Sequence, residues 1–196
     1  RNTVRALAAA GCTLVFVGIE SGKEEVRRRL LNRKVRDEDL IRAASLLHEH
    51  GIKLGTYNIV AVPGTSWRDD LATLDLNLRC RPHTTQALFL QPFAGTAVHE
   101  TAIREGMWGP KDDERLEACG QGLNRGSLLR YTDSRERRRV HNLRNLFGIT
   151  VAWPRLRPLV PALVDLPAGR IYARLGALWY IYCHLFVVHP GLAGPR

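Results

Sequence analysis

Residues 11–22 read GCTLVFVGIESG, an apolar run that ends in a carboxylate, a hydroxyl and a glycine. Within it, residues 13–19 are rich in β-branched and aromatic types, which is typical of a strand covered on both faces. Such strands belong to parallel sheets, whose ligand sites form where the strands end. We therefore expect Glu20 to lie at the mouth of a site at the carboxyl end of this strand.

The neighbouring segments alternate between helix and strand patterns. Apolar residues at helical spacing predict helices that end at Gly11, Gly51, Cys80 and about residue 105. Strand patterns cover residues 13–19, 52–64 and 85–96. Strands that alternate with helices at this spacing indicate an α/β fold built from right-handed βαβ units around a parallel sheet.

The chain of 196 residues carries 29 Lys and Arg against 19 Asp and Glu, a net charge of +10. This balance favours an anionic partner such as nucleic acid, phosphate or a membrane surface, and the alternative is a solvated arginine-rich surface. The charge runs at 27–29 and 135–144 lack the interleaved aromatics of a nucleic-acid site. We interpret both runs as solvated helical faces and expect no nucleic-acid partner.

The cysteines and histidines show no spacing typical of metal ligands. The four cysteines occur singly, at Cys12, Cys80, Cys119 and Cys183. We expect Cys12 and Cys183 to be small core residues, and a reduced, cytoplasmic chain. The sequence starts at Arg1 within a helical pattern, which predicts a chain that begins in the middle of a domain.

Three quoted stretches carry a family resemblance: AAAGCTLVFVGIESG (8–22), HGIKLGTYNIVAVPGTSWRDDLATL (50–74) and LQPFAGTAVHETAIREG (90–106). In order and spacing they resemble the second half of the radical S-adenosylmethionine (radical SAM) barrel. The resemblance is strongest to the cobalamin (B12)-binding branch, which includes magnesium-protoporphyrin monomethyl ester cyclase-like proteins and methyltransferases. It implies the C-terminal half of a partial (β/α)6 barrel over residues 1–107 and a helical C-terminal extension over 108–196.

The resemblance also implies an activity. Enzymes of this kind cleave S-adenosylmethionine at a [4Fe–4S] cluster, held by a CxxxCxxC loop, to drive radical methylation, cyclisation or rearrangement of a small or lipid-like substrate. The sequence contains no CxxxCxxC. We therefore expect a fragment, inactive alone, whose cluster loop and cobalamin domain lie upstream in the same protein.

Two alternatives remain open at this point. One is a degenerate, non-enzymatic half-barrel that binds or scaffolds. The other is a tRNA-modifying methylthiotransferase, but that family ends in a small β-rich RNA-binding domain, whereas residues 133–190 have helical spacing.

The resemblance assigns cofactor-binding roles around the first strand. Glu20 would bind the ribose hydroxyls or the amine of S-adenosylmethionine, with Ser21 as its neighbour. The alternative for Glu20 is a cap of the following helix. Either Arg33 or Lys34 would pair with the methionyl carboxylate, and the planar guanidinium favours Arg33.

The next two strand ends would hold the adenine. Ile59 would contact the base, and Pro63 and Gly64 would shape the turn. Ala61 stands where the family commonly has glycine, which would crowd the nucleoside slightly. Phe93 and Ala94 would pass beside the adenine, with a plain core position as the alternative for Phe93.

The tail contains an apolar segment, residues 168–188, that predicts one more helix. Its uninterrupted apolar stretch, broken at His184, is shorter than the ~20 residues needed to cross a bilayer. We expect a helix that packs on the barrel, and peripheral contact with a membrane surface is the alternative.

Overall fold

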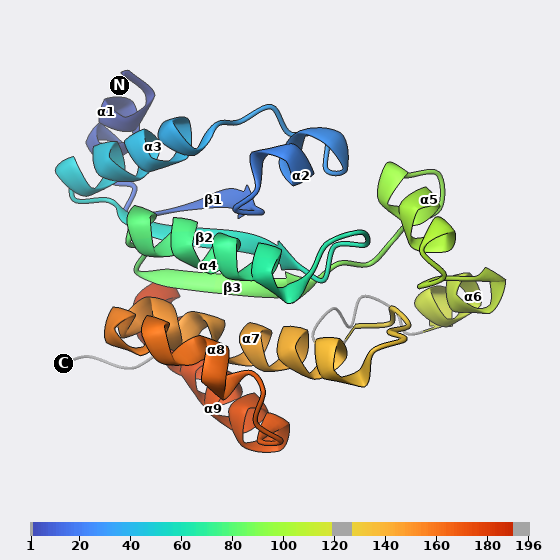
Figure 1. Ribbon diagram of the computed structural model, residues 1–196. Coiled ribbons are helices and arrows are strands. Elements are labelled where there is room, and N and C mark those ends of the chain that lie inside the picture. The colour runs from blue at the N-terminus through green and yellow to red at the C-terminus, as the bar shows by residue number, and fades with distance from the viewer. Residues whose placement is uncertain (1, 119–126, 190–196) are drawn as a thin grey trace.

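A computed structural model describes residues 2–118 and 127–189 of the chain. Its centre is a parallel sheet of three strands in the order β1 (Leu14–Glu20), β2 (Lys53–Val60) and β3 (Thr84–Phe89). The carboxyl ends of all three strands lie on the same side of the sheet (Figure 1). The predicted α/β class, with parallel strands followed by a helical extension, is confirmed.

The helices follow the predicted pattern closely. Those of the sheet region are α1 (Asn2–Ala9), α2 (Glu24–Arg29), α3 (Asp37–Glu49), α4 (Trp67–Cys80), α5 (Ala97–Arg104) and α6 (Pro110–Ala118). Those of the tail are α7 (Ser134–Ala152), η1 (Pro154–Leu159), α8 (Val160–Leu163), α9 (Gly169–Cys183) and η2 (His184–Val188). Cys119 lies outside the described residues.

Local signals set the helix ends. Ser66 and Asp69 form a capping box at the start of α4. The side chain of each residue accepts a hydrogen bond from the backbone N–H of the other. Gly51 follows α3 with φ +68, a left-handed conformation that glycine adopts at little cost. These two signals end α3 before β2 and begin α4 after it along the chain.

The two faces of the sheet differ. Ile19 and Leu54 belong to a buried cluster with Leu40 and Leu47 of α3 and Leu76 of α4. On the opposite face Phe16 stacks on Tyr57 with 4.8 Å between the ring centroids, and Tyr57 is exposed. Helices therefore cover one face, while the other stays open to solvent at Tyr57.

The tail packs against the edge strand and α4. A second buried cluster joins Leu74 of α4 and Phe89 of β3 to Leu143 and Phe147 of α7 and Val160 of α8. The sheet region and the helical extension thus share apolar core. The boundary at residue 107 stays a prediction.

The interpretation of residues 135–144 as a solvated face is wrong in part. Arg135 and Arg139 both bind the carboxylate of Asp165, at 3.1 Å and 2.7 Å from Nε to Oδ1. The half-buried Arg144 donates from Nε to the carbonyl of Ala87 on β3 at 3.1 Å. These arginines tie α7 to its neighbours, because their partners lie far away in sequence.

Candidate functional site

The carboxyl end of β1 presents an ion pair. Arg33 donates from Nη2 to Oε1 of Glu20 at 2.6 Å. Glu20 has φ +66, and the register with β2 shifts between Gly18 and Glu20. A non-glycine residue in the left-handed region is strained, and such strain is concentrated at functional sites.

Gly18 leaves the room that this ion pair occupies. A Cβ at residue 18 would lie 2.4 Å from Oε1 of Glu20 and 2.7 Å from Nη2 of Arg33. Any side chain there would push the pair aside. Glycine at position 18 therefore leaves space for the ion pair between Glu20 and Arg33.

The capping alternative for Glu20 does not match the structure. The residue that precedes α2 is Lys23, and its side chain makes no cap hydrogen bond. The buried Ser21 accepts a hydrogen bond at Oγ from the backbone N–H of Lys23, at 3.2 Å. Ser21 thus shapes the turn after Glu20, and Glu20 points its carboxylate to Arg33.

Arg27 holds the segment that carries Arg33, and the interpretation of residues 27–29 as a solvated face is wrong for this residue. Its side chain is 1% exposed and donates to the carbonyls of Ser21 and Val35 and to Asp37, the last at 2.5 Å. Arg27 therefore connects the turn after β1 to the start of α3. Sequence reasoning missed it because three consecutive arginines look alike.

Lys34, the other candidate for the carboxylate, is exposed. Among residues 2–118 and 127–189 it forms no ion pair with any acidic side chain. The structure brings Arg33, rather than Lys34, to Glu20.

The end of β2 contains a second strained residue. Ala61 has φ +63, which explains why glycine suits this position in the family that the sequence resembles. Its N–H donates to the two carboxylate oxygens of Asp70 at 3.1 Å and 3.3 Å. Asp70 is buried, and this burial raises the pKa of its carboxyl to about 7.

The other predicted residues of β2 and β3 lie at or just past the strand ends. Ile59 is half-buried against Val62, Leu90 and Val98. Pro63 is buried and Gly64 is exposed with φ +77.

After β3, Phe93 is 59% exposed and Ala94 is also exposed. The core alternative for Phe93 is therefore wrong. An exposed aromatic ring at a strand end can stack on a ligand.

The described cysteines do not form a cluster site. Cys80 and Cys183 are buried and Cys12 is half-buried, and Cys12 and Cys80 pack in the cluster under α3 and α4. Burial raises the pKa of Cys80 to about 11, which disfavours the thiolate that binds iron. Among the described residues, no group of three or more His, Cys, Asp or Glu side chains could hold a metal ion.

Anaerobic reconstitution of this chain with iron and sulfide should therefore give no stoichiometric [4Fe–4S] cluster. Such a cluster needs thiolates that converge, and the three described cysteines are dispersed. Iron analysis and the visible absorbance of the desalted protein measure this. One cluster per chain in both measurements would contradict the prediction.

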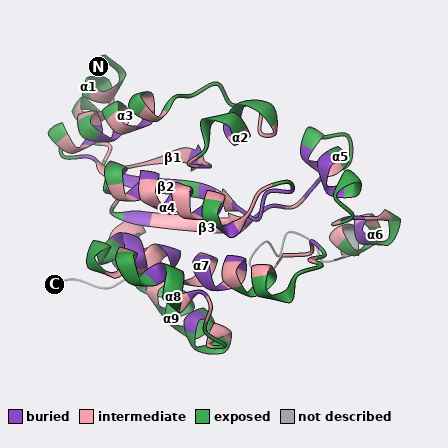
Figure 2. Ribbon diagram, in the orientation of Figure 1, coloured by how far each residue is buried: buried purple, intermediate pink, exposed green. Residues whose placement is uncertain are grey.

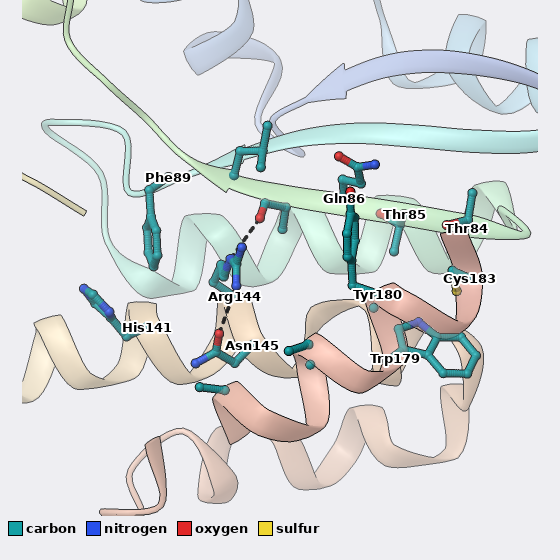
Figure 3. Close-up of a pocket in the computed structure, with 16 residues that line it drawn as sticks. Thr84, Thr85, Gln86, Phe89, His141, Arg144, Asn145, Trp179, Tyr180 and Cys183 are labelled. Atoms are coloured by element: carbon teal, nitrogen blue, oxygen red, sulfur yellow. Dashed lines mark hydrogen bonds between the residues drawn. The ribbon is translucent and has the colours of Figure 1, made fainter. Parts of the chain in front are cut away.

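A pocket lies elsewhere in the part of the chain that the structure describes. It has a volume of about 360 Å³ and lies between β3, α7 and α9. Figure 3 shows Gln86 on β3, Arg144 and Asn145 on α7, and Tyr180 on α9 around it. None of the predicted site residues lines it, so it is separate from the ion pair at the end of β1.

Residues 1–76 match the model of a protein family described as the radical SAM superfamily. This segment includes β1, β2 and most of α4, and it contains Glu20, Arg33, Ile59, Pro63 and Gly64. Phe93 and Ala94 lie beyond it. No curated protein matches the chain significantly.

Proposed function

We propose that residues 1–107 are the second half of a radical SAM barrel and bind S-adenosylmethionine at the carboxyl ends of β1, β2 and β3. The observation that carries this proposal is the Glu20–Arg33 pair, at 2.6 Å, inside the segment that matches the family. In the whole protein, a bound [4Fe–4S] cluster would supply the electron that cleaves S-adenosylmethionine to a radical acting on a small or lipid-like substrate.

The charges of the ion pair fit the methionyl group, which carries an ammonium and a carboxylate. Glu20 would accept from the ammonium or the ribose hydroxyls, and Arg33 would donate to the carboxylate through its planar fork. Before the ligand binds, the two side chains neutralise each other. The zwitterion can therefore enter without leaving either charge unpaired.

The ends of β2 and β3 would hold the adenine. Ala61 is left-handed and its N–H is bound by Asp70. With the chain turned in this way, Ile59 and the Pro63–Gly64 turn would flank the ligand. Phe93 is exposed and would stack beside the base, with Ala94 next to it.

The described cysteines do not fit the iron cluster, so its ligands would come from another segment of the same protein. The assignment to the cobalamin branch, and with it the use of cobalamin for radical methylation or cyclisation, rests on the sequence resemblance alone. We propose it on that ground, with the cobalamin site outside this chain.

The methylthiotransferase alternative finds no support in the tail. That family ends in a β-rich domain, whereas residues 127–189 contain helices and no strand. A degenerate half-barrel without radical chemistry remains the second candidate. Under this second candidate, the Glu20–Arg33 ion pair would only stabilise the fold and would bind no ligand.

Replacing Arg33 by glutamine should weaken the binding of S-adenosylmethionine by about 1–3 kcal/mol, the range for a lost charge-assisted hydrogen bond. Glu20→Gln should have a similar effect, because it removes the negative charge that would pair with the ammonium and leaves a neutral acceptor. Isothermal titration of S-adenosylmethionine into the chain and its variants gives both values. Thermal unfolding of each variant separates loss of binding from loss of fold.

Lys34→Gln is the matched control, since it removes one exposed positive charge from the next residue. It should leave binding unchanged. If Lys34→Gln weakens binding and Arg33→Gln does not, Arg33 is not the partner of the carboxylate. If the chain binds no S-adenosylmethionine while folded, the site proposed on these strand ends is wrong.

A further inference from the structure

Helix α9 has one face tied closely to α7. A Cβ at Gly176 would lie 2.6 Å from the carbonyl oxygen of Asn145, so the two helices touch at this point. Trp179 lies against Gly148 of α7, and a Cβ added to Gly148 would lie 2.9 Å from the ring of Trp179. Tyr172 and Cys183 on the same side are buried. The helix is therefore packed on this face, but its main partner is α7 of the helical extension, whereas the sequence predicts packing on the barrel.

Another face of α9, which continues into η2, carries exposed apolar side chains, and Figure 2 shows that much of α9 is exposed. We call it the apolar face, and its members are Ile171, Leu175, Leu178, Ile181, Tyr182 and Phe186. Ten of the fourteen exposed large apolar side chains of the described chain lie between Trp153 and Phe186. A concentration of this kind marks an interaction surface, because scattered apolar residues are the normal case.

The charges around the apolar face are positive. Residues 153–189 contain four arginines and one acid, Asp165, which is already bound to Arg135 and Arg139 of α7. One of the four, Arg157, pairs with Asp75 of α4 at 2.5 Å. Arg170 and Arg174 lie on α9 itself, are exposed, and form no ion pair within the described ranges. At i and i+4 spacing they lie in one row beside Ile171 and Leu175.

Aromatic rings border the apolar face. Trp153 lies 4.9 Å from Trp179, Trp179 lies 5.3 Å from Tyr182, and Tyr182 lies 5.1 Å from Phe186, all measured between ring centroids. Tryptophan and tyrosine are enriched where a protein meets the boundary between lipid headgroups and acyl chains.

We propose that the apolar face of α9 lies in the headgroup boundary of a membrane with anionic lipids and holds the protein on that surface. Its leucine, isoleucine and phenylalanine side chains would enter the acyl boundary, and Arg170 and Arg174 would bind lipid phosphates. This inference does not depend on the binding of S-adenosylmethionine.

Two other arrangements fit less well. The helical run Gly169–Val188 has 20 residues and is long and apolar enough to cross a membrane, contrary to the length expected from the sequence. A crossing helix, however, would have to leave α7 and abandon the contacts at Gly176 and Trp179. A second copy packed with its α9 parallel to this one would place the arginines of both copies close together, which is repulsive.

Sedimentation with vesicles tests the proposal on the whole 196-residue chain. The chain should pellet with vesicles of phosphatidylcholine plus phosphatidylglycerol, bind much less to phosphatidylcholine alone, and dissociate as salt rises. The double variant Leu178→Asp/Ile181→Asp should bind at least about tenfold more weakly, because charge replaces two inserted side chains. Arg170→Gln/Arg174→Gln should lose most of the preference for the anionic lipid.

Ile103→Asp is the matched control, since Ile103 on α5 and Ile181 on α9 are each 51% exposed. It should bind vesicles like the unchanged chain, and circular dichroism should show all variants folded. A folded chain that stays in the supernatant with anionic vesicles would overturn the proposal. So would a dimer that Leu178→Asp/Ile181→Asp converts to a monomer, because the apolar face would then join two copies.

Discussion

Arg27→Leu should lower the free energy of unfolding by about 2–4 kcal/mol, which is more than the same substitution at an exposed arginine should cost. The guanidinium is buried and binds Asp37 at 2.5 Å together with the carbonyls of Ser21 and Val35. Leucine fills part of the space but leaves these acceptors without their donor. Asp37 is 22% exposed, so solvent offsets part of the loss and the effect stays below that of a fully buried pair.

Arg29→Leu is the matched control for this effect. Arg29 is two residues away on the same helix and pairs with Glu25 at 2.6 Å, but both side chains are exposed. Such a pair contributes little, so the variant should change stability by at most about 0.5 kcal/mol. Urea denaturation of both variants gives the comparison. Equal losses at the two positions would show that the buried contacts of Arg27 are not what stabilises the turn.

The contrast between these arginines also shows what the sequence could and could not predict. The strands and most helices were predictable, because β-branched runs, helical spacing and glycine stops act over a few residues. Burial of Arg27 depends on Ser21, Val35 and Asp37 meeting around one guanidinium. No local sequence pattern predicts these contacts, and the three arginines at 27–29 look equivalent in the sequence.

The candidate site was predictable in part for the same reason. Glu20 directly follows a buried strand, so its place at the sheet edge follows from the pattern alone. Its pairing with Arg33 does not, because the intervening helix α2 and the contacts of Arg27 bring residue 33 back to the strand end. The positive φ of Ala61 was also hidden, since alanine gives no sign of a left-handed turn.

The buried Asp70 stabilises the turn at Ala61, but the free-energy cost of burying its carboxylate depends on pH. Its carboxylate accepts the N–H of Ala61, which favours the charged form, but complete burial outweighs that bond and raises the pKa to about 7. Asp69 and Glu136 raise the pKa of Asp70 further, because their negative charges repel the ionised form of its carboxyl. Near neutral pH the residue is therefore on the point of losing a proton inside the fold.

The sign of the effect follows from the two states. Above about pH 4 the unfolded chain has released the proton of an ordinary aspartate, whereas the folded chain keeps the proton of Asp70 up to about pH 7. The folded state then binds more protons, so stability falls as pH rises between these values. The contribution of Asp70 is complete below about pH 4 and is lost above about pH 7.

Asp70→Asn should remove this dependence, because asparagine can accept the same N–H of Ala61 through its carbonyl oxygen and does not titrate. The difference in unfolding free energy between the variant and the unchanged chain should shift in favour of the variant by roughly 2–4 kcal/mol from pH 4 to pH 8. Urea denaturation at several pH values measures the difference, in which the other titrating groups cancel. Titration of the Asp70 carboxyl by carbon NMR gives the pKa independently. Two results would contradict the prediction: a difference in unfolding free energy that stays constant from pH 4 to pH 8, or a carboxyl of Asp70 that titrates near pH 4. Either result would show that an ionised carboxylate binds the N–H of Ala61 and that burial does not determine the charge of Asp70.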